Sequence, residues 1–146
     1  MTNTLLISVL LLGFILFFTS CKTYFIPVDS FKQQLSGFDS SNMREVTTRG
    51  PVVERVTYKT YPIDIIHAID KSGNPVDLSK SPAIEVRITD TANKKTIFYF
   101  DLIQFDGENI IGSQSRFIST IKKTIPIASV KTIEVQNGRK NFRYVQ

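Results

Sequence analysis

The chain has 146 residues, the length of one ordinary domain, and its hydrophobic content of 42% is usual for a folded protein. The formal net charge is +5, and the sequence contains one cysteine and one histidine. This composition excludes a zinc site built from several Cys and His ligands. The seven glycines are scattered through predicted turns, which excludes a glycine-rich phosphate-binding loop.

The N-terminal part of the chain is an uncharged apolar segment. Fourteen residues from Leu5 to Phe18 carry no charge, and as a helix they would span about 21 Å at about 1.5 Å per residue. A helix needs about 20 residues to cross the hydrocarbon core of a bilayer. The segment is too short for a comfortable transmembrane helix, and it predicts a secretory signal peptide over residues 1–20.

The apolar segment ends in Phe18-Thr19-Ser20-Cys21. This sequence resembles the lipobox of bacterial lipoproteins, with Phe18 in place of the usual aliphatic residue. The resemblance implies cleavage before Cys21 and a multiply acylated Cys21 that anchors the chain in a membrane. Because Lys22 follows rather than Asp, it further implies the periplasmic face of the outer membrane. The alternative is a plain secretory signal that leaves an unpaired thiol in the exported protein.

Basic residues gather in the last fifth of the sequence. From Arg116 onward there are seven basic residues and one acidic residue, which gives this part a net charge of +6. The pattern predicts contact with anionic lipid or acidic glycan of the cell envelope. The candidate residues are Lys122, Lys123, Arg139, Lys140 and Arg143.

Two other interpretations of these basic residues stay open. They can be ordinary solvated side chains on exposed strands, an interpretation that we rank ahead of envelope contact. The segment 139–144 also alternates cations with aromatic residues, as proteins that bind single-stranded nucleic acid do. An exported, lipid-anchored chain is not expected to meet nucleic acid, so we rank this partner last.

The segment 21–50 is predicted to be a lipidated tether with a possible short helix. It contains stretches rich in turn-forming residues at 36–42 and 47–51. Asp29 and Ser30 could cap a helix of two turns. Phe31, Gln34, Leu35 and Phe38 follow at helical spacing.

A β domain is predicted over residues 51–146. Residues 83–90 alternate apolar and polar side chains, as a half-buried strand does, whereas residues 96–105 are apolar on both faces. Asp106-Gly107 predicts a hairpin into a return strand over 108–117.

Further strands are predicted upstream and downstream of this hairpin. The upstream segments are 52–61 and 62–70, the second closed by a turn at 72–75. Asn137-Gly138 predicts a second hairpin, which leads into a strand over 139–145.

A proline-initiated turn completes the pattern. Pro126 and the following residues predict a single 3₁₀ turn over 127–130 between two strands. The order of elements from 83 to 136 resembles the small five-stranded barrels of the SH3-like and Sm-like type. The fold class expected is therefore mostly β, a small barrel with extra strands, preceded by a signal peptide, a tether and a short helix.

The sequence offers no convincing catalytic set. His67 is in phase with Ile63, Ile65 and Ile69, so we expect a histidine in the core or at its rim, not a ligand or base. Asp101 could pair with Asp64 or Asp70 as an acid and base, or it could mark a bulge in its strand. We expect no enzyme activity and no cofactor.

Two functional hypotheses follow. The first is a non-enzymatic, membrane-anchored lipoprotein that presents a small β domain for contacts with proteins or with the envelope. The second is a carrier of a small apolar or lipid ligand, which would need a cavity beside the aromatic-rich strand 96–105.

Overall fold

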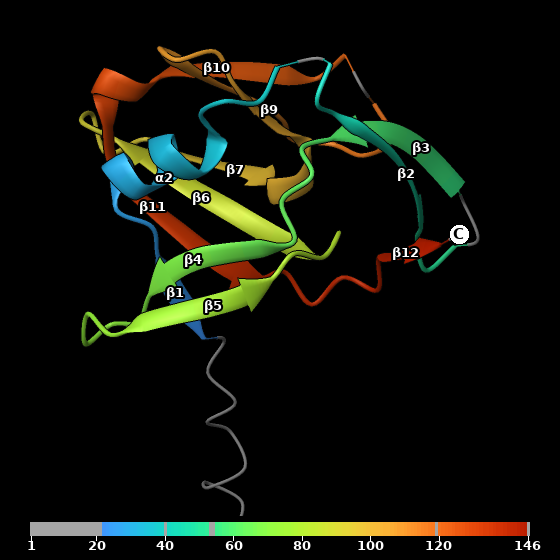
Figure 1. The fold of residues 1–146 in the computed structure, drawn as a ribbon, viewed down its shortest axis with the longest axis horizontal. Helices are drawn as coiled ribbons and strands as arrows, with labels where there is room; N and C mark the ends of the chain where they lie inside the picture. The colour runs from blue at the N-terminus through green and yellow to red at the C-terminus, as the bar shows by residue number, and fades with distance from the viewer. Residues whose placement is uncertain (1–21, 40, 53–54, 119, 146) are drawn as a thin grey trace, which may run out of the picture.

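The computed structural model describes residues 22–39, 41–52, 55–118 and 120–145 (Figure 1). The predicted signal peptide and the predicted lipidation site Cys21 lie outside these residues. The described chain is mostly β, with one short α-helix and two 3₁₀ turns. The mostly β class expected from the sequence is confirmed.

The elements follow one another without long gaps. In chain order they are β1 (Thr23–Phe25), α2 (Val28–Leu35), β2 (Arg44–Arg49), β3 (Arg55–Thr60), β4 (Ile65–Ile69), β5 (Pro75–Ser79), β6 (Ile84–Asp90), β7 (Lys95–Tyr99), η1 (Phe100–Leu102), β8 (Ile103–Phe105), β9 (Asn109–Ser113), β10 (Lys122–Pro126), η2 (Ile127–Ser129), β11 (Val130–Asn137) and β12 (Arg143–Val145).

The largest sheet has six strands in the order β5-β4-β1-β11-β6-β7. β1 pairs with both β4 and β11 in antiparallel register, and it therefore lies inside the sheet. The first strand of the described chain thus joins the β4–β5 hairpin to the rest of the sheet (Figure 1).

The segment expected to be a tether is built into the fold. Within 22–49, β1, α2 and β2 are regular elements, and Ile26, Phe31 and Leu35 are buried. β1 was not predicted, because a strand of three residues shows too little alternation to stand out from the residues around it. The predicted short helix exists, but it begins after Pro27, and no side chain caps it.

The aromatic-rich segment 96–105 is divided at Asp101. β7 ends at Tyr99, η1 turns the chain, and β8 starts at Ile103. β7 belongs to the six-stranded sheet, whereas β8 joins β9 and β10 in a second sheet of order β10-β9-β8. The turn at η1 therefore carries the chain from one sheet to another.

A third sheet, in the order β12-β2-β3, stands at the side of the molecule (Figure 1). The described strands thus form three antiparallel sheets and no closed barrel. η1 separates β7 from β8 along the chain, and the two strands pair in different sheets.

The core lies between the six-stranded sheet, the second sheet and α2. Ile66, Val86, Ile110 and Val135 are fully buried, and α2 contacts β4, β8 and β11. The predicted alternation in 83–90 is confirmed for its apolar face, where Ile84, Val86 and Ile88 are buried.

The two predicted hairpin turns have different outcomes. β8 and β9 do form a hairpin, but the connection has three residues, Asp106 to Glu108, with Gly107 at a φ of 99°. Asn137-Gly138 does not form a hairpin. β12 pairs with β2, because the chain leaves β11 and crosses to the third sheet. The predicted 3₁₀ turn is confirmed as η2.

Candidate functional site

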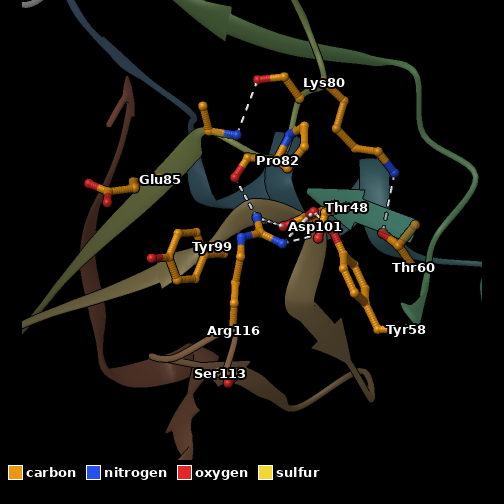
Figure 2. Close-up of polar contacts among 12 residues, drawn as sticks. Thr48, Tyr58, Thr60, Lys80, Pro82, Glu85, Tyr99, Asp101, Ser113 and Arg116 are labelled. Carbon is orange, nitrogen blue, oxygen red and sulfur yellow. Dashed lines mark hydrogen bonds and ion pairs between the residues drawn. The ribbon is translucent and has the colours of Figure 1, made fainter. Parts of the chain in front are cut away.

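A buried ion pair lies where the three sheets meet (Figure 2). Arg116 Nη2 donates to Asp101 Oδ1 at 2.7 Å, and Arg116 Nη1 donates to Asp101 Oδ2 at 3.1 Å. The two side chains are 1% and 0% exposed. Nη2 also donates to the carbonyl oxygen of Pro82. This two-pronged pairing is the geometry in which a guanidinium holds a carboxylate best.

Two tyrosines of the third sheet complete the pair. Tyr58 of β3 donates its hydroxyl to Asp101 Oδ2, and Tyr144 of β12 donates to the same oxygen at 3.3 Å. Arg116 Nη1 in turn donates to the Tyr58 hydroxyl at 2.7 Å. Burial, together with the negative charge of Asp101, raises the pKa of both tyrosines above the usual range. The network therefore ties the third sheet to η1.

Aromatic rings surround the guanidinium of Arg116. Its carbon Cζ lies 4.3 Å from the ring centroid of Tyr99, 5.1 Å from that of Phe142 and 5.5 Å from that of Tyr58. Burial disfavours the charged guanidinium, but the hydrogen bonds and charge of Asp101 outweigh it, so the pKa of Arg116 is raised. Neither charged side chain reaches solvent, and the cluster joins η1, the β9–β10 loop and the third sheet.

Lys80 lies beside Thr60 at the edge of the same junction (Figure 2). Its Nζ donates to the carbonyl oxygen of Tyr61 at 2.6 Å and to Thr60 Oγ1 at 3.3 Å. Partial burial, reinforced by the positive charge of Arg44, lowers the pKa of Lys80 to about 8.

The predicted anionic contact residues fall into two separate places. Arg139, Lys140 and Arg143 line a shallow hollow of about 810 Å³ together with Arg49. Lys122 and Lys123 lie on β10 instead, where Lys123 Nζ donates to Thr96 Oγ1 at 2.5 Å.

Lys140 is held in place beside this hollow. Its Nζ is 2.8 Å from Glu85 Oε1 and donates to the Tyr99 hydroxyl at 2.9 Å. Burial disfavours the ammonium, but the contacts to Glu85 and Tyr99 outweigh it and raise the pKa of Lys140.

Arginines form a row on the third sheet. Arg143 of β12 pairs directly with Arg49 of β2, and Arg49 pairs directly with Arg55 of β3. The sequence reading missed Arg49 and Arg55. Both arginines flank the β2–β3 turn in the sequence, but only the register of the two strands shows that they lie directly opposite one another.

His67 is exposed, contrary to the expectation of a histidine in the core or at its rim. Its side chain is 63% exposed, and Nδ1 lies 2.7 Å from Oδ1 of Asp77 on the neighbouring strand. The inward positions of β4 are Ile66 and Ala68, so the strand has the opposite phase to the one inferred.

The predicted carboxylates have separate partners. Asp64 is bound by Arg44, which lowers the pKa of Asp64. Asp70 accepts hydrogen bonds from the Ser72 and Asn74 amides in the β4–β5 turn. Asp101 forms the buried ion pair with Arg116. The structure therefore brings no two of these three carboxylates together as an acid and base.

Two hollows lie beside the second sheet. One, of about 470 Å³, is an open groove between the end of α2 and the β8–β9 hairpin. Its apolar lining includes Leu35, Phe38, Met43, Tyr61 and Ile111. The other, of about 250 Å³, shares Met43 and Ile111 with the groove and reaches Arg116.

The described residues contain no helix that is both long and apolar enough to cross a bilayer. Among the same residues, no three His, Cys, Asp or Glu side chains gather as a metal site would require. Comparison of the chain with protein-family models, with characterised proteins and with solved structures found no match.

Proposed function

We propose that this protein is a lipid-anchored, non-enzymatic module that presents a small β domain to other components of the bacterial envelope, on the periplasmic face of the outer membrane. The observation that carries the proposal is the position of β1. Its first residue, Thr23, follows the lipobox-like Cys21 by two positions, and β1 lies inside the largest sheet. An acyl group on Cys21 would therefore hold the folded domain directly against the bilayer.

The described side chains support a binding role over catalysis. The buried charged pair has no access to solvent, and the carboxylates considered as acid and base have separate partners. An accessible hollow is lined instead by the basic residues Arg49, Arg139, Lys140 and Arg143. Such a surface attracts anionic envelope lipid, glycan or protein.

The same proposal includes an SH3-like core over residues 83–136. The succession β6, β7, η1, β8, β9, β10, η2, β11 follows the expected order. In addition, β6 pairs with both β7 and β11, while β9 pairs with both β8 and β10. Two three-stranded halves that share one bent strand are the arrangement of a small, partly open barrel of this type.

Fractionation of cells tests the anchor. We expect the wild-type protein in the outer-membrane fraction and the Cys21→Ser variant either soluble or retained as an unprocessed precursor. Mass spectrometry of the wild-type protein should find a chain that begins at Cys21 and carries acyl groups. A wild-type chain with a free Cys21 thiol would overturn the proposal.

A second candidate is a binder of a small apolar ligand. The groove of about 470 Å³ between α2 and the β8–β9 hairpin favours it, because this volume lies in the range of ligand pockets and its lining is largely apolar. The groove is open, however, and the interior between the sheets is filled by packed side chains. We therefore place this function second.

A fluorescent fatty-acid probe tests the second candidate. If the groove binds apolar ligands, Met43→Lys should weaken binding of the probe several-fold, while Ile97→Lys, at an exposed position on β7, should not. Equal binding by both variants would remove the groove as the site.

A further inference from the structure

The arginine row of Arg143, Arg49 and Arg55 lies on the outer face of the third sheet, where Arg55 and Arg143 are exposed and Arg49 is half-buried. Side chains that are directly opposite on antiparallel strands share one face, with Cβ atoms about 4.5–5.5 Å apart. The neighbouring position Thr48 is 1% exposed, and Tyr144, its partner on β12, reaches Asp101. Since alternate residues point to opposite faces, the three arginines leave the sheet on its outer face.

The row is electrostatically unfavourable by itself. Like charges placed directly opposite one another destabilise a sheet. Among the described residues, no carboxylate forms an ion pair with Arg49, Arg55 or Arg143. An anion with several oxygen atoms would relieve the repulsion, and guanidinium groups bind phosphate oxygens in this manner.

Exposed apolar side chains flank the row. Val52, in the β2–β3 turn, is 79% exposed, and Phe117 and Ile118, in the β9–β10 loop, are 57% and 52% exposed. Phe142 connects the two loops, because its ring lies 6.2 Å from that of Phe117 and packs against Gly50, where a Cβ atom would come within 2.9 Å of it. Arginines and apolar loop residues thus occupy one end of the molecule.

This end is also continuous with the start of the described chain. The basic hollow that contains Arg49 and Arg143 includes Asn137 and Arg139. A neighbouring hollow shares Asn137 and Arg139 and extends to Lys22. The two hollows therefore connect the arginine row with the residue that follows Cys21, and every charged residue in their lining is basic.

We propose that this end, defined by Arg49, Arg55, Arg143, Val52 and Phe117, docks on an anionic lipid surface. The arginines bind lipid phosphates, and the two apolar side chains enter the boundary between headgroups and acyl chains. The inference rests on the proposed function, since the lipid on Cys21 would bring this end to the membrane. It adds which surface faces the lipid and which lipid chemistry is recognised.

Tryptophan fluorescence can test this orientation, because the sequence contains no tryptophan. The intact, lipidated Phe117→Trp variant is mixed with vesicles that contain brominated phosphatidylcholine, with or without phosphatidylglycerol. We expect several-fold stronger quenching by the brominated lipid when phosphatidylglycerol is present. The matched Ile97→Trp variant places the fluorophore at another exposed apolar position, on β7, and its quenching should not change.

Charge removal tests the arginines separately. In the Phe117→Trp background, Arg49→Gln with Arg143→Gln should reduce quenching several-fold. Removing two charges from the β6–β7 turn and β7, with Lys94→Gln and Lys95→Gln, should leave it unchanged. Quenching that is equal with and without phosphatidylglycerol, or equal in both double variants, would overturn phosphate recognition by the row.

The remaining outcomes are distinct. A protein that sediments with every vesicle but shows no quenching of Phe117→Trp is anchored in another orientation, so the inference fails and the proposed function stands. A protein that binds only vesicles with phosphatidylglycerol has the docking surface but lacks the anchor.

If inorganic phosphate reverses the quenching more than chloride at equal ionic strength, the row binds a soluble phosphate and the lipid surface is the wrong ligand. Self-association that Phe117→Ser abolishes would assign this end to a second copy of the chain instead.

Discussion

Asp101 accepts hydrogen bonds from Arg116, Tyr58 and Tyr144, which come from three separate parts of the chain. A buried ion pair contributes little net stability compared with apolar packing, because both ions lose their hydration. Removal of one partner lowers the free energy of unfolding strongly, because the other charge then stays buried without a counter-charge. We therefore expect the junction to position the third sheet rather than to add a large stabilisation.

The first prediction concerns this pair. Asp101→Asn should lower the free energy of unfolding by about 3–5 kcal/mol, because the Arg116 guanidinium then stays buried without its counter-charge. Urea denaturation measures the change. The control is Glu134→Gln, which breaks a half-exposed pair with Arg87 at 3.6 Å and should cost about 0–1 kcal/mol. Equal effects of the two variants would show that the junction is not a critical ion pair.

Lys80 carries a pH-dependent prediction. Its pKa of about 8 in the folded protein lies below the ordinary value of 10.5 because it is partly buried beside Arg44. The unfolded chain therefore binds more protons than the folded one between these two pH values, and the contribution of Lys80 to stability rises as the pH increases from about 8 to 10.5. Comparison of urea midpoints for wild type and Lys80→Met across this window should show the rise in the wild type alone. Parallel curves would contradict the lowered pKa.

The elements differ in how well they can be read from the sequence. β6 and η2 were predicted correctly, since alternation over several residues and a proline at the start of a turn are local signals. The hairpin predicted at Asn137-Gly138 was wrong, because β12 pairs with β2 and not with β11. A pairing between distant segments here overrides the local turn preference. The contacts of Arg116 with Tyr58 and Asp101 could not be predicted from the sequence, because they depend on how distant loops and strands pack together.

At Gly112 of β9, the second sheet lies close to Phe98 of the six-stranded sheet. A Cβ atom at this position would lie 2.5 Å from the Phe98 ring, and Phe98 is 1% exposed. Gly112→Ala should therefore force β9 away from β7 and destabilise the protein by about 1–3 kcal/mol. Combining it with Phe98→Leu provides the control. The double variant should lose less stability than the sum of the single variants, because the smaller side chain makes room. Strictly additive losses would contradict a direct clash.

At the scale of the whole molecule, the described residues form one folded unit, whose first strand, β1, and last strand, β12, lie in different sheets. β1 occupies the position between β4 and β11, and the Ile26 amide donates to the Ile133 carbonyl oxygen at 2.9 Å. No register pairs β4 with β11 directly. The six-stranded sheet is thus continuous only through the three residues that follow Lys22.

Truncation tests this arrangement. A chain that begins at Lys22 should unfold cooperatively, because it retains every described strand. A chain that begins at Pro27 lacks β1 and Ile26, so the β4–β5 hairpin loses its attachment and β11 gains an open edge. We expect this shorter chain to unfold at a markedly lower urea concentration and to aggregate through the open edge. Circular dichroism and light scattering measure the two effects. Equal urea midpoints for both chains would mean that residues 22–26 act as a tether after all, and the domain would then stand free of the membrane.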